Sequence, residues 1–193
     1  MIKKNAAARE IIITAAMKLI ERHGDTSIIT IRDIAARAGV GTGLINYHFQ
    51  TKENLINICV QRIINLEVEK FEPLYKSLDV KPADKLRLLA KSTCAFLAAN
   101  PGISRVSILT DLQAGNADDN SIQVQKAYLP LIKEVCGGKK TDGEAQLLLH
   151  MLLSSIQVAF LRKDVLIKTA DMDFSSKEQR DAYVDSIIDI LFS

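Results

Sequence analysis

The residues best suited to contact a nucleic acid lie in one short stretch, Thr42 to His48. Thr42 and Gly43 open an expected helix and are small enough to let its N-terminus approach a phosphate backbone closely. Asn46 carries an amide that can form two hydrogen bonds to adenine, with a phosphate contact as the alternative. No carboxylate occurs between Val40 and Phe49, so none would repel phosphate. This stretch has the chemistry of a DNA-contacting helix.

A preceding helix is expected to hold that stretch in place. Thr30 stands at an N-cap position, and Asp33 follows three residues later, which is a capping-box pattern. Apolar residues from Ile31 to Ala38 recur at helical spacing and give the helix one apolar face. Gly39 should end it, because the tight reversal needs a residue that tolerates positive φ.

The remaining signals complete a helix-turn-helix pattern. The second helix is expected from Gly41 and Thr42 to about Phe49, and Thr51 caps a third that begins at Lys52. In this motif the first helix braces the second, and the second enters the major groove.

The same residues resemble the N-terminal signature of the tetracycline-repressor (TetR) family. The resemblance covers roughly a quarter of the chain and depends on identities and spacing together. The sequence departs from the family at Gly41, where a hydroxyl residue is common, and at Asn46, where an aromatic residue is frequent. The matching residues are Ile31-Arg32-Asp33-Ile34-Ala35, Ala38-Gly39-Val40, Gly43, Tyr47-His48-Phe49, Lys52-Glu53 and Leu55.

The resemblance implies phosphate contacts for four residues. Thr30 and Lys52 lie at helix starts, with a plain cap and a solvated lysine as the alternatives. Tyr47 and His48 match positions that hold the DNA backbone in the family. Without that match, Tyr47 would be a surface residue and His48 a half-buried core histidine. The complete expected DNA-binding set is Thr30, Thr42, Gly43, Asn46, Tyr47, His48 and Lys52.

Composition supports a modestly basic head on a neutral body. Met1 to Leu55 holds eight Lys/Arg against five Asp/Glu, whereas the whole chain carries a net charge of only +2. This asymmetry fits a DNA-contacting head, although chance is an even alternative. An aromatic content of 5% without Trp argues against a stacking platform for single strands.

Cysteine and histidine usage argues against a metal site, a cofactor or an enzyme. Cys59, Cys94 and Cys136 lie far apart, which indicates reduced thiols in a cytoplasmic protein, with a redox sensor as the less favoured reading. The histidines show no catalytic or metal-ligand spacing. The N-terminus is interrupted by Arg9-Glu10 and is expected to be an amphipathic helix, and no apolar run is expected to span a membrane.

Two late segments suggest a homodimer. Glu144 to Leu161 is apolar almost all the way round, and Ser176 to Phe192 follows a capping box at Ser175 and Glu178. A second subunit would cover the remaining face in a four-helix interface, with a wholly intramolecular core as the alternative. The expected interface residues are Leu148, Leu152, Ile156, Val184, Ile187, Ile188 and Leu191.

An effector pocket is expected among the helices from Pro82 to Leu161. The scarcity of charge there favours an apolar or neutral small molecule. Each polar candidate has the alternative of a satisfied core residue. The candidates are Thr93, Thr110, Gln113, Tyr128, His150, Ser154 and Gln157.

Together these features predict an all-α protein of about nine helices. Residues 1–51 would form a three-helix DNA-binding head and residues 52–193 an effector-binding and dimerisation body. The expected function is a ligand-responsive regulator, a repressor released from a palindromic double-stranded operator. The alternatives are a constitutive DNA-binding dimer that recruits a protein partner, or an enzyme body carrying a DNA-binding head. Activation instead of repression stays open.

Overall fold

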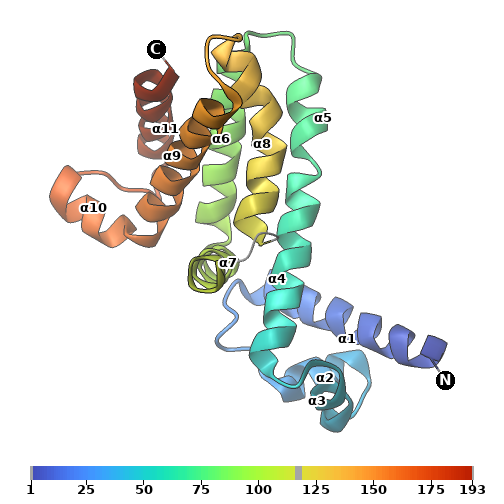
Figure 1. Ribbon diagram of the computed structural model, residues 1–193. Helices are drawn as coiled ribbons and strands as arrows, with labels where there is room; N and C mark the ends of the chain where they lie inside the picture. The colour runs from blue at the N-terminus through green and yellow to red at the C-terminus, as the bar shows by residue number, and fades with distance from the viewer. Residues whose placement is uncertain (1, 116–118, 193) are drawn as a thin grey trace. The chain divides into compact units, whose positions relative to one another are not determined.

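The computed structural model describes residues 2–115 and 119–192, with the side chains of 2–5 and 72 excepted. All regular structure in these residues is helical, which confirms the all-α prediction (Figure 1). Eleven helices are present in this part of the chain, against the nine or so expected. They are α1 (Ile2–His23), α2 (Ile31–Ala38), α3 (Thr42–Phe49), α4 (Lys52–Val68), α5 (Phe71–Lys76), α6 (Pro82–Ala99), α7 (Pro101–Ala114), α8 (Asn120–Cys136), α9 (Asp142–Leu161), α10 (Lys163–Ala170) and α11 (Lys177–Phe192).

The chain divides into two compact units. The first comprises Met1–Leu66 together with Asn100–Asn116, so it contains α1 to α3, most of α4, and α7. The second comprises Glu67–Ala99 and Ala117–Ser193. The first unit is thus larger than the 1–51 head expected from sequence, because it also contains α7. A functional boundary at residue 51 stays a prediction.

The core of the first unit forms where α1, α2 and α3 pack together. Ile12 and Ile20 of α1, Ile34 of α2 and Ile45 of α3 are all at most 1% exposed. In the connector before α2, Ile29 fills this core at 2% exposure, whereas Ile28 is 57% exposed. The regular spacing of apolar residues along α1, α2 and α3 therefore builds one small core beneath α3.

The helix that follows α3 ends before the proline of this region. Helix α4 stops at Val68, and Pro73 lies within α5. Proline is tolerated there because it occupies the first turn of α5, where its missing N–H has no intrahelical acceptor. Pro73 is therefore not the residue at which α4 ends.

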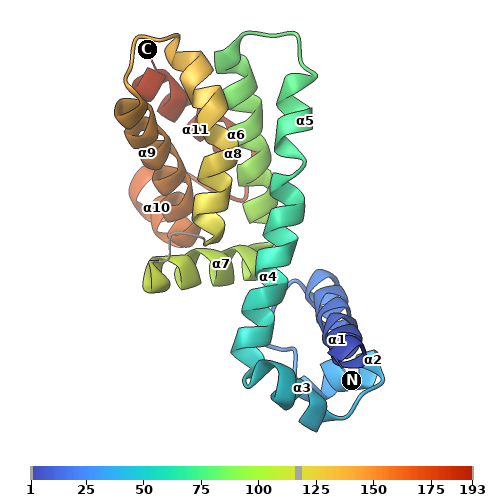
Figure 2. The ribbon, with the colours of Figure 1, turned by 45° about the vertical axis from the view of Figure 1, so that its right-hand side comes forward.

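In the second unit α6 is the central helix, in contact with α5, α8, α9 and α11 (Figure 2). Its buried face includes Leu86, Leu89 and Cys94. Its outer edge is joined to α11 by Arg87, which bonds Asp185 and Asp189, and by Lys91, whose Nζ lies 2.7 Å from Asp185 Oδ2. These pairs join α6 to α11 over about one helical turn.

Helix α8 contains Pro130 and is not divided by it. Asp119 caps the start of α8 by accepting from Ile122 N at 2.8 Å.

The start of α11 differs from expectation. Ser175 was expected to cap this helix, but its hydroxyl donates to Asp173 Oδ1. Ser176 Oγ accepts from Gln179 N instead.

The last two long helices bury more of themselves than expected. Leu152 and Ile156 of α9 and Val184 and Ile188 of α11 are at most 1% exposed within one chain. These four side chains are therefore already covered within one chain, and their place in a subunit interface stays a prediction. Leu148, Ile187 and Leu191 are half-buried. By length and composition α9 is apolar enough to cross a membrane, contrary to expectation, but its buried stripe identifies it as a core helix of the second unit.

Candidate nucleic-acid interface

The capping box at the start of α2 forms as the sequence predicts. Thr30 Oγ1 accepts from Asp33 N at 3.2 Å, and Asp33 Oδ2 accepts from Thr30 N at 2.9 Å. The Thr30 hydroxyl also donates to Asp33 Oδ2 at 2.6 Å. These bonds hold the pKa of Asp33 below its usual value. The structure thus shows Thr30 as a cap, and its phosphate contact stays a prediction.

The turn between α2 and α3 depends on two glycines. Gly39 has φ +66°, in the left-handed region that glycine adopts without strain, and its N–H bonds back to the last turn of α2. Gly41 is the N-cap of α3 and supplies no side-chain hydrogen bond to the helix start. The first N–H groups of α3 therefore have no side-chain cap. They can donate hydrogen bonds to an anion such as phosphate.

The two sides of α3 differ sharply in exposure. Ile45 and Phe49 are each 1% exposed and anchor the helix on the core. Thr42, Gly43, Asn46 and Tyr47 are exposed. Positions four apart share one face of a helix, so these four form a single surface. We refer to Thr42, Gly43, Asn46 and Tyr47 as the reading face.

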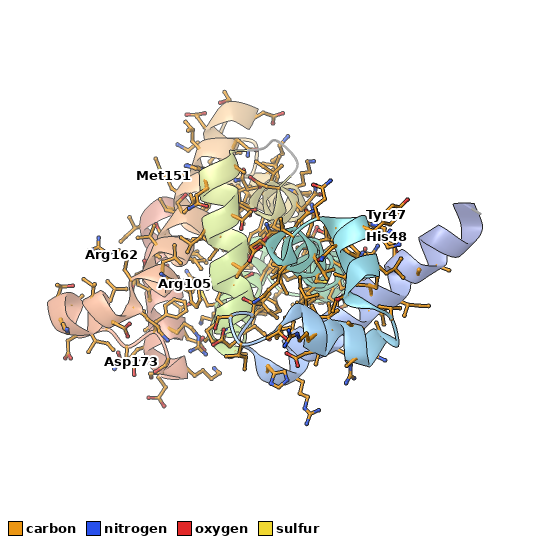
Figure 3. All side chains as sticks on the ribbon, turned by 90° about the horizontal axis from the view of Figure 1, so that it is seen from below. Tyr47, His48, Arg105, Met151, Arg162 and Asp173 are labelled. Carbon is orange, nitrogen blue, oxygen red and sulfur yellow. The ribbon has the colours of Figure 1, made fainter. Side chains whose placement is uncertain are left out.

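Tyr47 and His48, adjacent in sequence, differ in their surroundings. Tyr47 is 70% exposed, and Figure 3 shows its side chain reaching away from α3. His48 is half-buried, its ring lies edge-on to Tyr47 at 5.1 Å, and its Nε2 is inaccessible and has no hydrogen-bond partner in the described part of the chain. Tyr47 is thus available to a phosphate as it stands. For His48, only the other ring nitrogen or a rotation of the ring offers such a contact.

Lys52 begins α4 beside the connector that precedes α2. Its Nζ donates to the Ser27 carbonyl at 3.3 Å, which leaves two of the three ammonium protons for other acceptors. Thr51 Oγ1 accepts from Asn54 N at 3.1 Å, which confirms the expected cap. The bond to this neutral carbonyl therefore holds the ammonium beside the connector.

Two contacts of α1 that sequence reasoning missed help to position α3. The Arg9 guanidinium carbon lies 5.4 Å from the centroid of the Phe49 ring, a cation–π geometry. Arg62 of α4 bonds Glu10 of α1, the residue next in sequence to Arg9. The partners are distant in sequence and follow no local motif, so spacing alone gives no signal for either contact.

The comparisons with known proteins agree with this geometry. Residues 12–58 match the family model described as "Bacterial regulatory proteins, tetR family". The head is a TetR-family DNA-binding domain. The matched segment runs from the buried stripe of α1 through the TetR helix-turn-helix into α4, and it includes all seven residues expected to bind DNA. Comparison with curated proteins gives no match.

Solved structures of TetR regulators share the fold of nearly the whole chain. A TetR-family regulator from Mesorhizobium loti aligns over 97% of this chain and 96% of its own, with 18% identity and a TM-score of 0.62. RolR in complex with resorcinol covers 98% and 90% at 15% identity and a TM-score of 0.69. FadR from Bacillus subtilis in complex with stearoyl-CoA covers 95% and 97% at 20% identity and a TM-score of 0.58. The second unit thus has the fold of a TetR regulator body.

The residues expected to line an effector pocket are divided between the two compact units. Thr110 and Gln113 belong to the first compact unit, and the other five belong to the second. Gln113 and His150 are exposed, so the expectation that they point inward is wrong. Both lie on helix faces turned away from the core of their own unit.

Three of the remaining candidates are engaged in the core. Tyr128 is fully buried, and its hydroxyl lies 2.5 Å from Thr93 Oγ1. Gln157 Nε2 donates to Ser121 Oγ at 3.1 Å. Ser154 instead lines an open groove of about 570 Å³ between α9, α10 and α11, together with Arg162, Val165 and Tyr183. Thr93 and Tyr128 therefore act as a satisfied polar pair of the core, which was the alternative for each.

The cysteines are poorly suited to sensing oxidants. Burial raises the pKa of both Cys59 and Cys94 from the ordinary 9.0 to about 12. Half-buried Cys136 also has a raised pKa, chiefly through burial. Because the thiolate is the reactive form, a raised pKa disfavours the reaction of all three thiols at neutral pH.

Proposed function

We propose that this protein is a ligand-responsive transcriptional regulator that binds a palindromic operator as a homodimer and is released by a small molecule. The observation that carries the DNA-binding part is the reading face: four exposed small or polar residues on a TetR-family reading helix that has no acid. Such a helix can enter the major groove with its N-terminus against phosphate. Within the reading face, Thr42, Gly43 and Asn46 supply base contacts. Tyr47, Lys52 and Thr30 supply backbone contacts.

A homodimer is supported by the apolar side chains that one chain leaves uncovered. Leu147 is 59% exposed, Met151 50% and Val158 51%, all on α9, and Ile190 of α11 is 81% exposed. Exposed apolar residues spaced along two neighbouring helices mark an interaction surface. A two-fold axis would place α9 and α11 against the same pair from a second copy. We refer to Leu147, Met151, Val158 and Ile190 as the apolar face.

Pairing matters because one reading helix contacts too few bases to be selective. Two heads related by a two-fold axis read half-sites about 34 Å apart, one helical turn of DNA, or a multiple of it. A ligand that changes the head separation by a few ångströms therefore weakens operator binding. By linkage, such a ligand must bind the DNA-free protein more tightly than the DNA-bound protein.

A small-molecule effector is supported by what fold relatives bind. RolR was solved with resorcinol and FadR from Bacillus subtilis with stearoyl-CoA, so this fold accommodates both a small phenol and an acyl thioester. For this chain we propose an apolar or neutral effector held by the second unit. A protein with this function acts in the cytoplasm, where its operator is.

The proposal is tested with duplex DNA from upstream of the protein's own gene. Wild-type protein is titrated onto labelled duplex by fluorescence anisotropy, with a scrambled duplex of equal length as the control. A thermal-shift screen of small molecules then supplies candidates, and each is tested for release of the duplex. Binding of the upstream duplex no tighter than the scrambled one would reject the regulator, whereas tight binding that no stabilising compound relieves would favour the constitutive dimer.

A further inference from the structure

Helix α7 meets the turn after α1 at a point where no side chain fits. A Cβ atom added to Gly102 would lie 2.1 Å from the Gly24 carbonyl oxygen and 3.1 Å from Asp25 Cα. Both residues belong to the first compact unit. Because the opposing atoms are backbone, no flexible side chain can move aside to make room.

The turn that receives α7 is itself held in place. Gly24 ends α1 with φ +66°, and its N–H donates to the Ile20 carbonyl at 2.8 Å. Next to Gly102 on α7, Ile103 is 1% exposed and Ser104 is fully buried. The helix start is therefore closely packed at this contact, which we call the glycine seat (Gly24 and Gly102).

The glycine seat lies directly upstream of the DNA-contacting elements. From Gly24 the chain passes through Asp25 and Ser27, whose carbonyl accepts from Lys52 Nζ, to the Thr30 cap of α2. At the other end of α7, Thr110 Oγ1 donates to Asn57 Oδ1 of α4 at 3.5 Å. Through these contacts α7 touches both the connector into α2 and the helix that follows α3.

Helix α7 also continues the second unit covalently. The central helix α6 ends at Ala99, and Asn100 alone separates it from Pro101, the first residue of α7. Pro101 fixes φ at the first helical position, so the link between the two helices is short and stiff. The end of α6 and the start of α7 are therefore joined through a single residue.

We propose that the glycine seat is a positioning contact through which α7 fixes the orientation of the helix-turn-helix. Effector binding in the second unit would shift α6, and α7 would pass that shift to the turn before α2, in addition to any movement of α4. This inference rests on the proposed function for its regulatory meaning, but the seat itself can be tested without DNA. It makes Gly102 a positioning residue that touches no base or phosphate.

The chain supplies a matched control for this contact. Gly143 is the second residue of α9, as Gly102 is of α7, but a Cβ on Gly143 would have no neighbour within 4 Å. Gly102→Ala and Gly143→Ala therefore make the same chemical change at the same helical position. Only the first forces backbone atoms apart.

The experiment compares both variants with wild type by amide hydrogen exchange and by anisotropy with the upstream duplex. For Gly102→Ala we expect exchange in residues 24–38 to rise about tenfold, exchange in α9 to stay unchanged, and duplex affinity to fall about tenfold. Gly143→Ala should match wild type in all three readouts. Identical exchange and affinity in the two variants would overturn the proposal.

Two further results keep the inference separate from the proposed function. If wild type binds no duplex specifically, the regulator is rejected while hydrogen exchange still tests the seat. If Gly102→Ala fails to fold, Thr110→Val is used, since it preserves side-chain shape and removes only the bond to Asn57. Faster exchange in α2 and in the first turns of α4 would then support the role of α7, and unchanged exchange would refute it.

Discussion

Arg62 on α4 binds both carboxylate oxygens of Glu10 on α1, with Nη1 to Oε2 at 2.5 Å and Nη2 to Oε1 at 2.8 Å. The pairing lowers the pKa of Glu10 and raises that of Arg62. It joins the first helix of the head to the helix that follows α3. Because Arg9 next to Glu10 lies over Phe49, one end of α1 is joined to both α3 and α4.

Removing this ion pair should lower the free energy of unfolding only slightly, and the size of the loss should depend on pH. For Glu10→Gln we expect a loss of less than about 1 kcal/mol, because the two side chains are 51% and 38% exposed and water screens them. A folded-state pKa below the unfolded value contributes stability above pH 4.5 that is lost as pH falls through the folded pKa. Urea unfolding at pH 7 and pH 3 checks this: the difference in unfolding free energy between wild type and variant should be smaller at pH 3 than at pH 7, and an equal difference at both would contradict it.

Lys52→Ala should weaken binding to all duplex sequences by a similar factor. An ammonium that neutralises one phosphate releases about one counterion, so the slope of log K against log salt should fall by about 0.9. Tyr47→Ala should also weaken binding to every sequence, but with an unchanged slope because Tyr47 carries no charge. Anisotropy titrations at four salt concentrations separate the two cases. An unchanged slope for Lys52→Ala would rule out a phosphate contact by Lys52.

Charge placed on the apolar face should separate subunits without unfolding them. Met151→Glu adds a carboxylate to a half-exposed position, so we expect a folded monomer that binds a palindrome no better than a single half-site. Ile188→Glu is the contrast, because Ile188 is 1% exposed and a buried carboxylate should unfold the chain. Light scattering and circular dichroism distinguish these outcomes. A fully dimeric Met151→Glu would place the interface elsewhere.

Tyr128→Phe should destabilise the second unit by about 1 kcal/mol, the net value of one hydrogen bond. The hydroxyl it removes is paired with Thr93, and the ring edge contacts Phe71 at a centroid distance of 5.8 Å, which the variant keeps. Thermal unfolding measures the loss. Any effector found by screening should bind the variant as tightly as it binds wild type. A large loss of effector affinity would show that Tyr128 contacts the effector.

Alkaline unfolding should reveal the buried thiol of Cys59. Its pKa in the folded protein is raised to about 12, so its contribution to stability is complete below pH 9 and is lost as pH rises toward 12. Cys59→Ala removes that contribution, and the stability of the variant should decline less steeply from pH 9 to pH 11 than that of wild type. If the unfolding free energies of wild type and variant declined in parallel, the thiol would ionise as readily in the folded protein as in the unfolded protein.

The head was predictable because its signals are local. The Thr30–Asp33 box, the left-handed Gly39 and the uncapped start at Gly41 each depend on residues within one turn. The sequence placed all of them correctly. The contacts of α1 with α3 and α4, and the seating of α7 on Gly24, join distant parts of the chain and follow no periodic pattern.

The body was less predictable because its longest helix is apolar on every side. Periodicity assigns a face only when another face is polar, and α9 gives no such contrast. The sequence therefore offered no means of telling that Leu152 and Ile156 are buried within one chain whereas Met151 and Val158 are exposed. Short α10 was missed altogether, since a helix of eight residues with none of them buried has little apolar pattern to detect.

The membership of α7 in the first compact unit has a consequence for biosynthesis. Residues 1–66 leave the ribosome before residues 100–116, so the nascent chain exposes an unfinished head while α5 and α6 are still being made. A transcript cut after α4 would encode the complete recognition motif, yet the resulting fragment would lack the helix that closes on Gly24.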